Sequence, residues 1–321
     1  MAIKAVFGGA SLNPHGAFAK DEAVQEVFAT LKKHGVLTLD TARLYEGSEE
    51  TIGRIAGHED FVIDTKIIGG FAPGTAKKDA VISDAQDSLK RVQIKQFDIL
   101  YLHAPDASIP IAETLEGIND VYKQGVFQRF GLSNFSAEQV QEVYDIAQSR
   151  GFVLPSVYQG NYSPVARHLE TLLFPTLRKL DFAFYAYSPL AGGFLTKTPQ
   201  QLEDGVGRFS ADVLGGMYND LYNKPSLREA LAEWNAIADK EGISKAELAY
   251  RWVGYNGALK ADLGDGVIFG ASSVRQIEQT AQGLKKGALS DEARDRIEAI
   301  WEKVKGDAPV DNYVSSFALK L

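Results

Sequence analysis

Eight short apolar runs recur along this chain, and segments with helical spacing separate them. The runs cover residues 5–10, 36–42, 61–66, 97–103, 127–134, 156–162, 182–190 and 266–273. Parallel strands need a crossover connection, usually a helix, so strands that alternate with helices predict a parallel sheet. The runs are continuously apolar rather than alternating, which indicates that both faces of the sheet are covered. An α/β protein is therefore expected.

Helix signals fall where this alternation requires them. Apolar residues between positions 24 and 31 follow helical spacing, and Gly35 marks a stop. Ser136 with Gln139, and Ser244 with Glu247, have the spacing of a capping box. A helix is expected to begin directly after each of these two serines.

Eight strand–helix units between residues 5 and 273 match the size of a (β/α)8 TIM barrel, which takes about 250 residues. A doubly wound open sheet is the alternative, and it usually carries a glycine-rich turn, G-x-G-x-x-G, after its first strand. The segment "GGASLNPHG" follows the first run and lacks that spacing. We therefore predict a single (β/α)8 TIM-barrel domain over residues 1–321.

Two segments fall outside the regular alternation. Residues 190–226 contain many glycines and no sustained periodicity. Long irregular loops in compact domains are usually functional lids or disordered. Because this loop follows the seventh run, it is expected to lie over the C-terminal end of the barrel. The tail, residues 306–321, is a second segment expected to fold across that end.

Composition excludes several kinds of site and partner. The net charge of -8 argues against nucleic acid or an anionic membrane as the main partner, since both attract basic surfaces. The chain has no cysteine, so disulfides, thiolate metal sites and cysteine nucleophiles are excluded. No apolar run approaches the roughly 20 residues of a membrane span, and the first residues lack the apolar stretch of a signal peptide. A cytoplasmic protein is the default expectation.

Polar residues stand at the C-terminal ends of all the runs after the first. In a barrel these ends converge on one site. The second, third and fourth runs end at Asp40, Lys66 and His103, and Tyr45 follows shortly after the second. The later ends are Ser133 and Asn134, Gln159, Tyr187 and Ser188, and residues 270–273.

The combination of Asp40, Lys66, His103 and Tyr45 suits proton donation by the tyrosine. One histidine and one aspartate make a poor metal site, and a standard glycosidase needs two facing carboxylates. A phenol has a pKa near 10, and a nearby ammonium lowers it by favouring the phenolate. Asp40 would hold Lys66 charged and in place. A neutral imidazole could orient a carbonyl oxygen.

Several segments resemble the signature segments of the aldo-keto reductases, in order from about residue 7 to the end of the chain. They are "DTARLYEGSEE", "DTK", "YLHAPD", "GLSNFS", "VYQGNYSP", "FYAYSPLAGGFLT" and "VIFGASSVRQIEQ". "ETLLFPTLRK" and "VGRF" are most similar to the aflatoxin-aldehyde (succinic-semialdehyde) reductase subfamily. The resemblance implies a (β/α)8 barrel without bound metal, NADPH as cofactor, and an aldehyde or ketone as substrate. It also suggests a homodimer.

The resemblance assigns roles to the four residues at the first strand ends. Tyr45 corresponds to the general acid, and Asp40 and Lys66 support it. His103 corresponds to the residue that orients the substrate carbonyl.

It also assigns a set of residues to the cofactor. Ser133, Asn134 and Gln159 match residues that bind the nicotinamide carboxamide, and Tyr187 matches the ring that stacks on the nicotinamide. The residues that match the pyrophosphate loop and a cofactor-contacting arginine are Ser188, Leu190, Gly192, Lys197 and Arg208.

The adenine end of the cofactor is expected after the eighth run. Ser273 and Gln276 have capping-box spacing, and helix N-termini suit phosphate groups. Ser272, Arg275 and Gln276 are placed to meet the 2′-phosphate or the adenine, although Arg275 could equally be a solvent-exposed helix charge. Thr280 stands where relatives usually have asparagine, and this departure bears on the preference for NADPH over NADH.

The resemblance also departs in the substrate pocket. Subfamily members that reduce carboxylate-bearing aldehydes use two arginines, and those positions hold Leu221 and, roughly, Ser315. An arginine–carboxylate pair is a strong, specific contact. The sequence therefore predicts a preference for neutral or aromatic aldehydes. Candidate lining residues are Phe209, Tyr218 and Tyr222, with loop packing as the alternative role for both tyrosines.

A nicotinamide-binding regulatory subunit with little turnover is the alternative function. Potassium-channel β subunits resemble this family and retain the same four residues, so those residues do not discriminate between the two functions. The close match to the reductase loop favours the enzyme.

Overall fold

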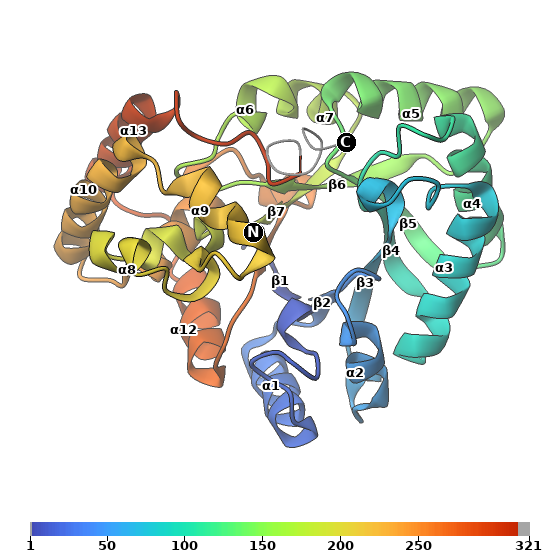
Figure 1. The fold of residues 1–321 in the computed structure, drawn as a ribbon, viewed down its shortest axis with the longest axis horizontal. Coiled ribbons are helices and arrows are strands. Elements are labelled where there is room, and N and C mark those ends of the chain that lie inside the picture. Colours follow the sequence, from blue (N-terminus) through green and yellow to red (C-terminus); the bar gives the residue numbers. More distant parts are fainter. Residues whose placement is uncertain (1, 314–321) are drawn as a thin grey trace.

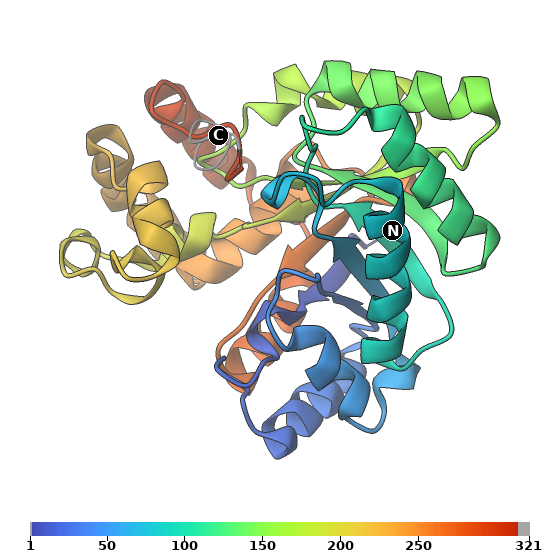
Figure 2. The same ribbon diagram turned by 45° about the vertical axis from the view of Figure 1, so that its right-hand side comes forward.

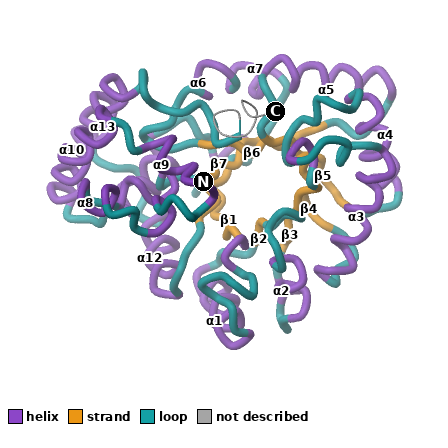
Figure 3. The backbone as a smooth tube through the Cα atoms, viewed as in Figure 1, coloured by secondary structure: helices purple, strands orange, loops and turns teal. Residues whose placement is uncertain are grey.

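The protein forms a closed barrel of eight parallel strands in a computed structural model that describes residues 2–313. Each strand pairs with the next one along the chain, and β8 pairs with β1. Figure 3 shows the strands in the middle and the helices around them. The strands are β1 (Lys4–Gly8), β2 (Thr38–Asp40), β3 (Val62–Ile67), β4 (Phe97–Leu102), β5 (Phe127–Ser133), β6 (Pro155–Asn161), β7 (Ala183–Tyr187) and β8 (Gly266–Phe269). The predicted TIM barrel is confirmed, and the open-sheet alternative is wrong because β1 and β8 close the ring.

Helices connect the strands and cover the outside of the barrel (Figure 1). The helices before β7 are α1 (Asp21–His34), α2 (Ser48–Arg54), α3 (Lys78–Val92), α4 (Ile111–Lys123), α5 (Ala137–Arg150), α6 (Leu169–Leu172) and α7 (Phe174–Lys179). Those after β7 are α8 (Pro199–Glu203), α9 (Met217–Tyr222), α10 (Pro225–Glu241), α11 (Lys245–Arg251), α12 (Val274–Leu284) and α13 (Asp291–Val304).

The expected helix ends form, with one difference. The Ser136 hydroxyl accepts from the Gln139 amide at 3.2 Å, and the Gln139 side chain accepts from the Ser136 amide at 2.8 Å, so that capping box is complete. Ser244 caps α11 by accepting from the Glu247 amide at 3.1 Å. The Glu247 side chain instead pairs with Lys286, so only half of the second box forms.

The long connection after β7 contains short helices, which differs from the irregular loop that the sequence predicts. Thr198 and Gln201 form a capping box that begins α8, and α9 and α10 follow before β8. Figures 1 and 2 both show α8 and α9 on one side of the barrel, together with α10 and α13. Of these, α8 and α9 have only five and six residues, too few for a periodic apolar pattern to be visible in the sequence.

Two apolar layers hold the barrel together. One lies between the outer faces of the strands and the surrounding helices. The other fills the barrel interior, and its main members are Val6, Ile99, Tyr101, Val157 and Tyr185. Because side chains alternate across a strand, residues two positions further along face the same interior. This alternation delivers polar side chains to the C-terminal end of the interior. Across residues 2–313, none of the helices has the length and apolarity needed to cross a membrane.

Candidate active site

A buried ion pair occupies the C-terminal end of the barrel. Asp40 is the last residue of β2, and Lys66 lies near the end of β3. The Lys66 ammonium donates to both carboxylate oxygens of Asp40, at 2.8 and 2.7 Å, and to the carbonyl oxygen of Thr41 at 2.7 Å. The Lys66 side chain is 0% exposed. All three ammonium hydrogens therefore have acceptors, which keeps the charge in one place.

A short turn carries Tyr45 back over this pair. The Tyr45 amide donates to the Ala42 carbonyl at 2.9 Å, and the Ser48 hydroxyl donates to the Gly9 carbonyl at 2.9 Å. Ser48 is the first residue of α2, and its hydrogen bond to Gly9, directly after β1, holds the turn in place. The Lys66 ammonium lies 5.2 Å from the centre of the Tyr45 ring.

His103 completes the group of four directly after β4. Its ring lies edge-on to the Tyr45 ring, with the centres 6.0 Å apart. Burial and the nearby Lys66 charge both hold the pKa of His103 well below its usual value. The imidazole is therefore neutral at physiological pH, as the sequence analysis assumes. The structure brings all four predicted residues to one place.

Burial decides the acidity of Tyr45. Burial raises its pKa above the usual value, and this effect outweighs the lowering by Lys66. A lysine beside the tyrosine predicts a lowered pKa from the sequence, and this prediction is wrong because burial has the larger effect. Burial also lowers the pKa of Lys66, but the attraction of Asp40 and Tyr45 outweighs it and the net shift is upward. Tyr45 is thus protonated and Lys66 charged at neutral pH.

The residues expected to bind the nicotinamide carboxamide surround the same group. Gln159 donates to Asp40 Oδ1 at 2.9 Å, and Ser133 is its partner in the pairing of β5 with β6. Asn134 donates to the His103 carbonyl oxygen at 2.8 Å, with its backbone at φ 63°. The Tyr187 hydroxyl donates to the Asn134 side-chain oxygen at 3.3 Å. The amides are therefore fixed in orientation beside the proposed reacting centre.

The loop after β7 turns sharply through left-handed backbone conformations. Ser188 has φ 54° and Gly192 has φ 69°. A Cβ at Gly192 would lie 2.0 Å from the Tyr218 ring, so only glycine allows this approach. Leu190 and Lys197 flank the short helical turn, Ala191–Thr196, that contains Gly192. The loop thereby presses against the segment that carries Tyr218.

Cations gather near this loop. Burial lowers the pKa of Lys245, and the positive charge of Lys197 adds to the lowering. Lys197 lies close to Gly207, the residue before Arg208. The Arg208 guanidinium donates to the Tyr218 hydroxyl at 3.2 Å and lies 5.4 Å from the centre of its ring. Lys245 also donates to the Lys197 carbonyl oxygen at 3.2 Å, so two ammonium groups and a guanidinium belong to this part of the structure.

The predicted adenine end lies at the start of α12. Ser273 caps this helix by accepting from the Gln276 amide at 3.4 Å. The Gln276 side chain accepts from the Ser272 amide at 2.8 Å, one residue before the capping-box position. Arg275 is exposed. Thr280 is buried, and its side chain forms a hydrogen bond with Tyr250. Unlike the other three predicted residues, it therefore has little surface open to a ligand.

Of the three predicted substrate residues, Tyr218 alone interacts with the group of four. Its hydroxyl influences the pKa of Tyr45. Phe209 is buried against Tyr218, and Tyr222 is fully buried and accepts a hydrogen bond from Asn161 at 3.2 Å. Phe209 and Tyr222 therefore pack within the loop, which for Tyr222 is the alternative role that the sequence left open.

Only one of the two positions that the resemblance aligns with arginines, Leu221 and Ser315, lies within the described residues. Leu221 is buried on α9. Ser315 lies outside the described residues.

Two aromatic residues near His103 were missed. The Phe71 ring lies 4.7 Å from the His103 ring and 5.0 Å from the ring of Tyr313, centre to centre. The Tyr313 hydroxyl donates to the Gly70 carbonyl at 2.9 Å, so the described part of the tail reaches the loop after β3. Phe71 follows Lys66 by five residues, in a loop at the same end of the barrel. Its position in the sequence is the only feature that could have indicated Phe71 as a residue of the site.

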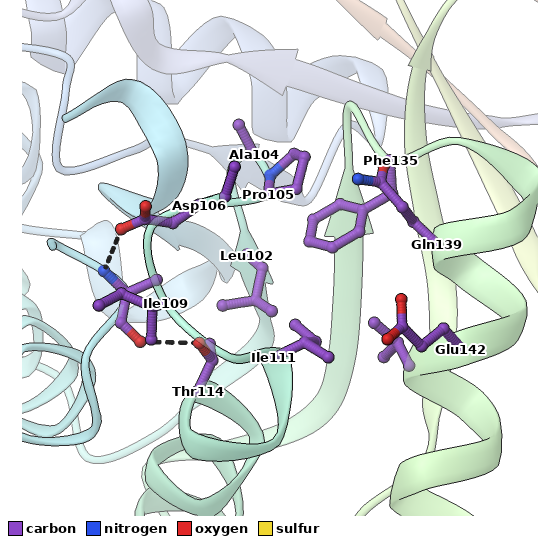
Figure 4. Close-up of a pocket in the computed structure, with 13 residues that line it drawn as sticks. Leu102, Ala104, Pro105, Asp106, Ile109, Ile111, Thr114, Phe135, Gln139 and Glu142 are labelled. Atoms are coloured by element: carbon purple, nitrogen blue, oxygen red, sulfur yellow. Dashed lines mark hydrogen bonds between the residues drawn. The ribbon is translucent and has the colours of Figure 1, made fainter. Parts of the chain in front are cut away.

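A cavity of about 200 Å³ lies beside the site, between α4 and α5 (Figure 4). Two of its polar groups have partners within the protein, since Asp106 accepts from the Gly74 amide at 2.8 Å and Thr114 donates to the Ala76 carbonyl at 2.8 Å. None of the four residues Asp40, Tyr45, Lys66 and His103 lines this cavity. Within residues 2–313, no group of three or more histidines and carboxylates is arranged to hold a metal ion.

A closed (β/α)8 barrel with a polar cluster at the C-terminal ends of its strands is typical of an enzyme. Residues 4–302 match the model of the Aldo/keto reductase family. The chain belongs to this family, whose members are NAD(P)H-dependent oxidoreductases of aldehydes and ketones.

Relatives cover most of the chain. It is 39% identical over 291 residues to "Oxidoreductase sirO" of Leptosphaeria maculans, covering 90% of this chain and 88% of that protein. It is 36% identical over 296 residues to "Aflatoxin B1 aldehyde reductase member 4" of Homo sapiens, covering 86% and 88%. The crystal structure of an aldo/keto reductase from Klebsiella pneumoniae with NADP and acetate has the same fold, with a TM-score of 0.69 at 24% identity, covering 95% of this chain and 92% of that one.

Proposed function

We propose that this protein is an NADPH-dependent carbonyl reductase in which Tyr45 is the general acid. The observation that carries the proposal is the fully buried Lys66 ammonium, held by Asp40 and placed beside the Tyr45 ring. A charge held so rigidly in a dry site stabilises the phenolate that remains after proton transfer. The experiment that tests it is oxidation of NADPH with an aldehyde, compared between the wild type and Tyr45→Phe.

Tyr45 donates its proton to the carbonyl oxygen of the substrate. Because burial keeps the pKa of Tyr45 high, the hydroxyl is protonated at neutral pH and available as a donor. Lys66 then faces the phenolate and lowers the free energy of the transition state. The neutral His103 donates or accepts a hydrogen bond without a competing charge, which suits it to orient the carbonyl.

The residues present fit a dinucleotide with its phosphates. When bound, NADPH supplies the hydride, from nicotinamide C4 to the carbonyl carbon. Ser133, Asn134 and Gln159 would hold the carboxamide, and Tyr187 would stack on the ring. The loop residues Ser188, Leu190, Gly192 and Lys197, with Arg208, would hold the pyrophosphate. Lys245 donates to the Lys197 carbonyl oxygen at 3.2 Å and so brings a second ammonium group to this place, which supports an anion there.

At the adenine end, Arg275 is the exposed cation nearest the start of α12 and would meet the 2′-phosphate. Ser272 and Gln276 would meet the phosphate or the adenine. A panel of aldehydes run with both NADPH and NADH tests this proposal. Equal kcat/KM with the two cofactors would contradict a role for Arg275 in recognising the 2′-phosphate.

We further propose that neutral or aromatic aldehydes are preferred over carboxylate-bearing ones. Leu221, buried on α9, offers no charge to a substrate carboxylate. The aromatic cluster of Phe209, Tyr218 and Tyr222 in the same loop is uncharged instead. The comparison is kcat/KM for 2-nitrobenzaldehyde against succinic semialdehyde. A higher value for the semialdehyde would remove this proposal and leave the reductase itself intact.

The resemblance to the subfamily also leads us to propose one domain and a homodimer. Light scattering would then give twice the chain mass of 35.0 kDa. A mass of one chain across micromolar concentrations would contradict the dimer.

A further inference from the structure

A second carboxyl group lies inside the barrel, on the N-terminal side of the Asp40–Lys66 pair. Asp64 precedes Lys66 by two residues on β3, so both side chains lie on the same face of the strand. Its Cα is paired in register with that of Asp40 on β2. Asp64 is 0% exposed. Two carboxyl groups therefore share the barrel interior with the one ammonium that serves Tyr45.

Asp64 is poorly prepared to carry a charge. Its Oδ1 accepts from the Ile99 amide at 3.2 Å. Its Oδ2 is buried without a hydrogen-bond partner among the described residues. Asp40, in contrast, receives two hydrogen bonds from Lys66. An ionised carboxylate with an unbonded oxygen costs far more to bury than the neutral acid does.

The charges that face Asp64 do not supply the missing partner. Arg129 is already paired with Asp98, at 2.9 and 2.6 Å, and Lys4 donates to the Tyr185 hydroxyl at 2.8 Å. Burial raises the pKa of Asp64 to about 8, with Asp98 and Asp40 adding to the rise. The groups that interact with it from the surrounding strands are Lys4, Asp40, Lys66, Asp98, Tyr101 and Arg129.

We propose that Asp64 is a positioning residue for Tyr45, acting through Lys66, and that it supports proton donation only in its neutral form. When Asp64 releases its proton to solvent, a second carboxylate attracts the Lys66 ammonium. The phenolate that forms on Tyr45 is then less stabilised, and Tyr45 is a weaker acid. This inference rests on the proposed function, since it requires Tyr45 to be the proton donor.

The ionisation of Asp64 should set the alkaline limb of the pH profile, which is the fall of kcat/KM at high pH. As pH rises through the ionisation of Asp64, kcat/KM for an aldehyde should fall. In Asp64→Asn the side chain stays neutral at every pH, and its oxygen can still accept from the Ile99 amide. The limb should therefore move upward in pH until another group ionises. A purely structural role for Asp64 would change kcat/KM by the same factor at every pH.

The test measures kcat/KM for 2-nitrobenzaldehyde at saturating NADPH across the pH range. For Asp64→Asn we expect the limb to move up by about one pH unit or more, with the dissociation constant for NADPH unchanged. Glu49→Gln is the matched control. Glu49 is also buried and accepts from Thr65 on the opposite face of β3, at 2.6 Å. In Glu49→Gln the alkaline limb of kcat/KM should coincide with that of the wild type.

Two results would overturn the inference: a wild type without an alkaline limb, or an unmoved limb in Asp64→Asn. If Asp64→Asn does not fold, Asp64→Ser, whose side chain is also neutral, takes its place in the test. Infrared spectroscopy of the wild type gives an independent measurement, because a protonated carboxyl band should disappear in step with kcat/KM. A band that is missing at neutral pH would count against the inference.

The outcome for Tyr45→Phe separates the two proposals. If that variant keeps its turnover, the proposed function fails, whatever Asp64 does. If it is inactive and the limb is unmoved in Asp64→Asn, only the role of Asp64 fails.

Discussion

Both carboxylate oxygens of Asp40 accept hydrogen bonds from the same Lys66 ammonium, at 2.8 and 2.7 Å, inside a barrel that excludes water from the pair. This relationship separates the two jobs that the site has to perform. Asp40 fixes the charge, and Lys66 presents it to Tyr45. A carboxylate held in this way is a poor proton donor, since its oxygens are already occupied by the ammonium and by Gln159.

Breaking this pair should be costly to stability. Asp40→Ala leaves Lys66 buried without its counter-charge, and we expect the free energy of unfolding to fall by about 3–5 kcal/mol. Lys32 and Asp60 form a matched control, because their atoms are also 2.7 Å apart but their side chains are 39% and 55% exposed. Asp60→Ala should cost at most about 1 kcal/mol. Urea unfolding measures both, and equal losses would contradict the burial argument.

The contact between Gly192 and Tyr218 gives a second prediction. Gly192→Ala places a Cβ where the Tyr218 ring lies, so the ring must leave its present position. We expect a higher KM for the aldehyde, and a loss of stability of about 1–3 kcal/mol from the left-handed backbone. Steady-state kinetics and thermal unfolding measure the two effects.

Gly193→Ala is the control for this prediction. Gly193 also has a positive φ, 101°, but a Cβ there would meet nothing within 4 Å. It should lose stability and keep the KM of the wild type. The same KM increase in both variants would show that backbone strain, rather than the position of Tyr218, controls substrate binding.

The raised pKa of Asp64 predicts how stability depends on pH. The carboxyl ionises near 3.8 in the unfolded chain and near 8 in the folded protein. Between these values the folded state holds a proton that the unfolded chain releases, so rising pH destabilises the fold. The slope from this one group is at most about 1.4 kcal/mol per pH unit.

Asp64→Asn removes this contribution. The difference in free energy of unfolding between variant and wild type should shift in favour of the variant from pH about 4 to about 8, and then level off. Urea unfolding at several pH values in this window checks the prediction. Parallel stability curves for the two proteins would mean that Asp64 is not protonated in the fold.

The barrel was predictable from the sequence because its strands are short apolar runs between clear helix signals. The same alternation placed Asp40, Lys66 and His103 at neighbouring strand ends, so the core of the site follows from local pattern and topology. The position of Asp64 inside the barrel was also predictable, since it precedes Lys66 by two residues and shares its face of the strand. Its significance depends on burial, which the pattern alone did not reveal.

Other features depend on contacts between distant segments. The Gln159 side chain bonds Asp40 across the barrel, and Tyr313 reaches Gly70 from the far end of the chain. Tyr222 and Tyr218 are the same residue type in the same loop, yet Tyr222 is enclosed by the loop and accepts a hydrogen bond from Asn161. The net acidity of Tyr45 is likewise set by its surroundings, because burial outweighs the lysine beside it. Residue type and spacing do not determine these outcomes.

The most direct test of the account is Tyr45→Phe, which removes one hydroxyl and keeps the ring. We expect the dissociation constant for NADPH to stay near that of the wild type, while kcat for 2-nitrobenzaldehyde falls by a factor of about 100 to 10,000. Fluorescence titration and NADPH oxidation give the two values. Turnover close to that of the wild type, with NADPH still bound, would contradict Tyr45 as the proton donor.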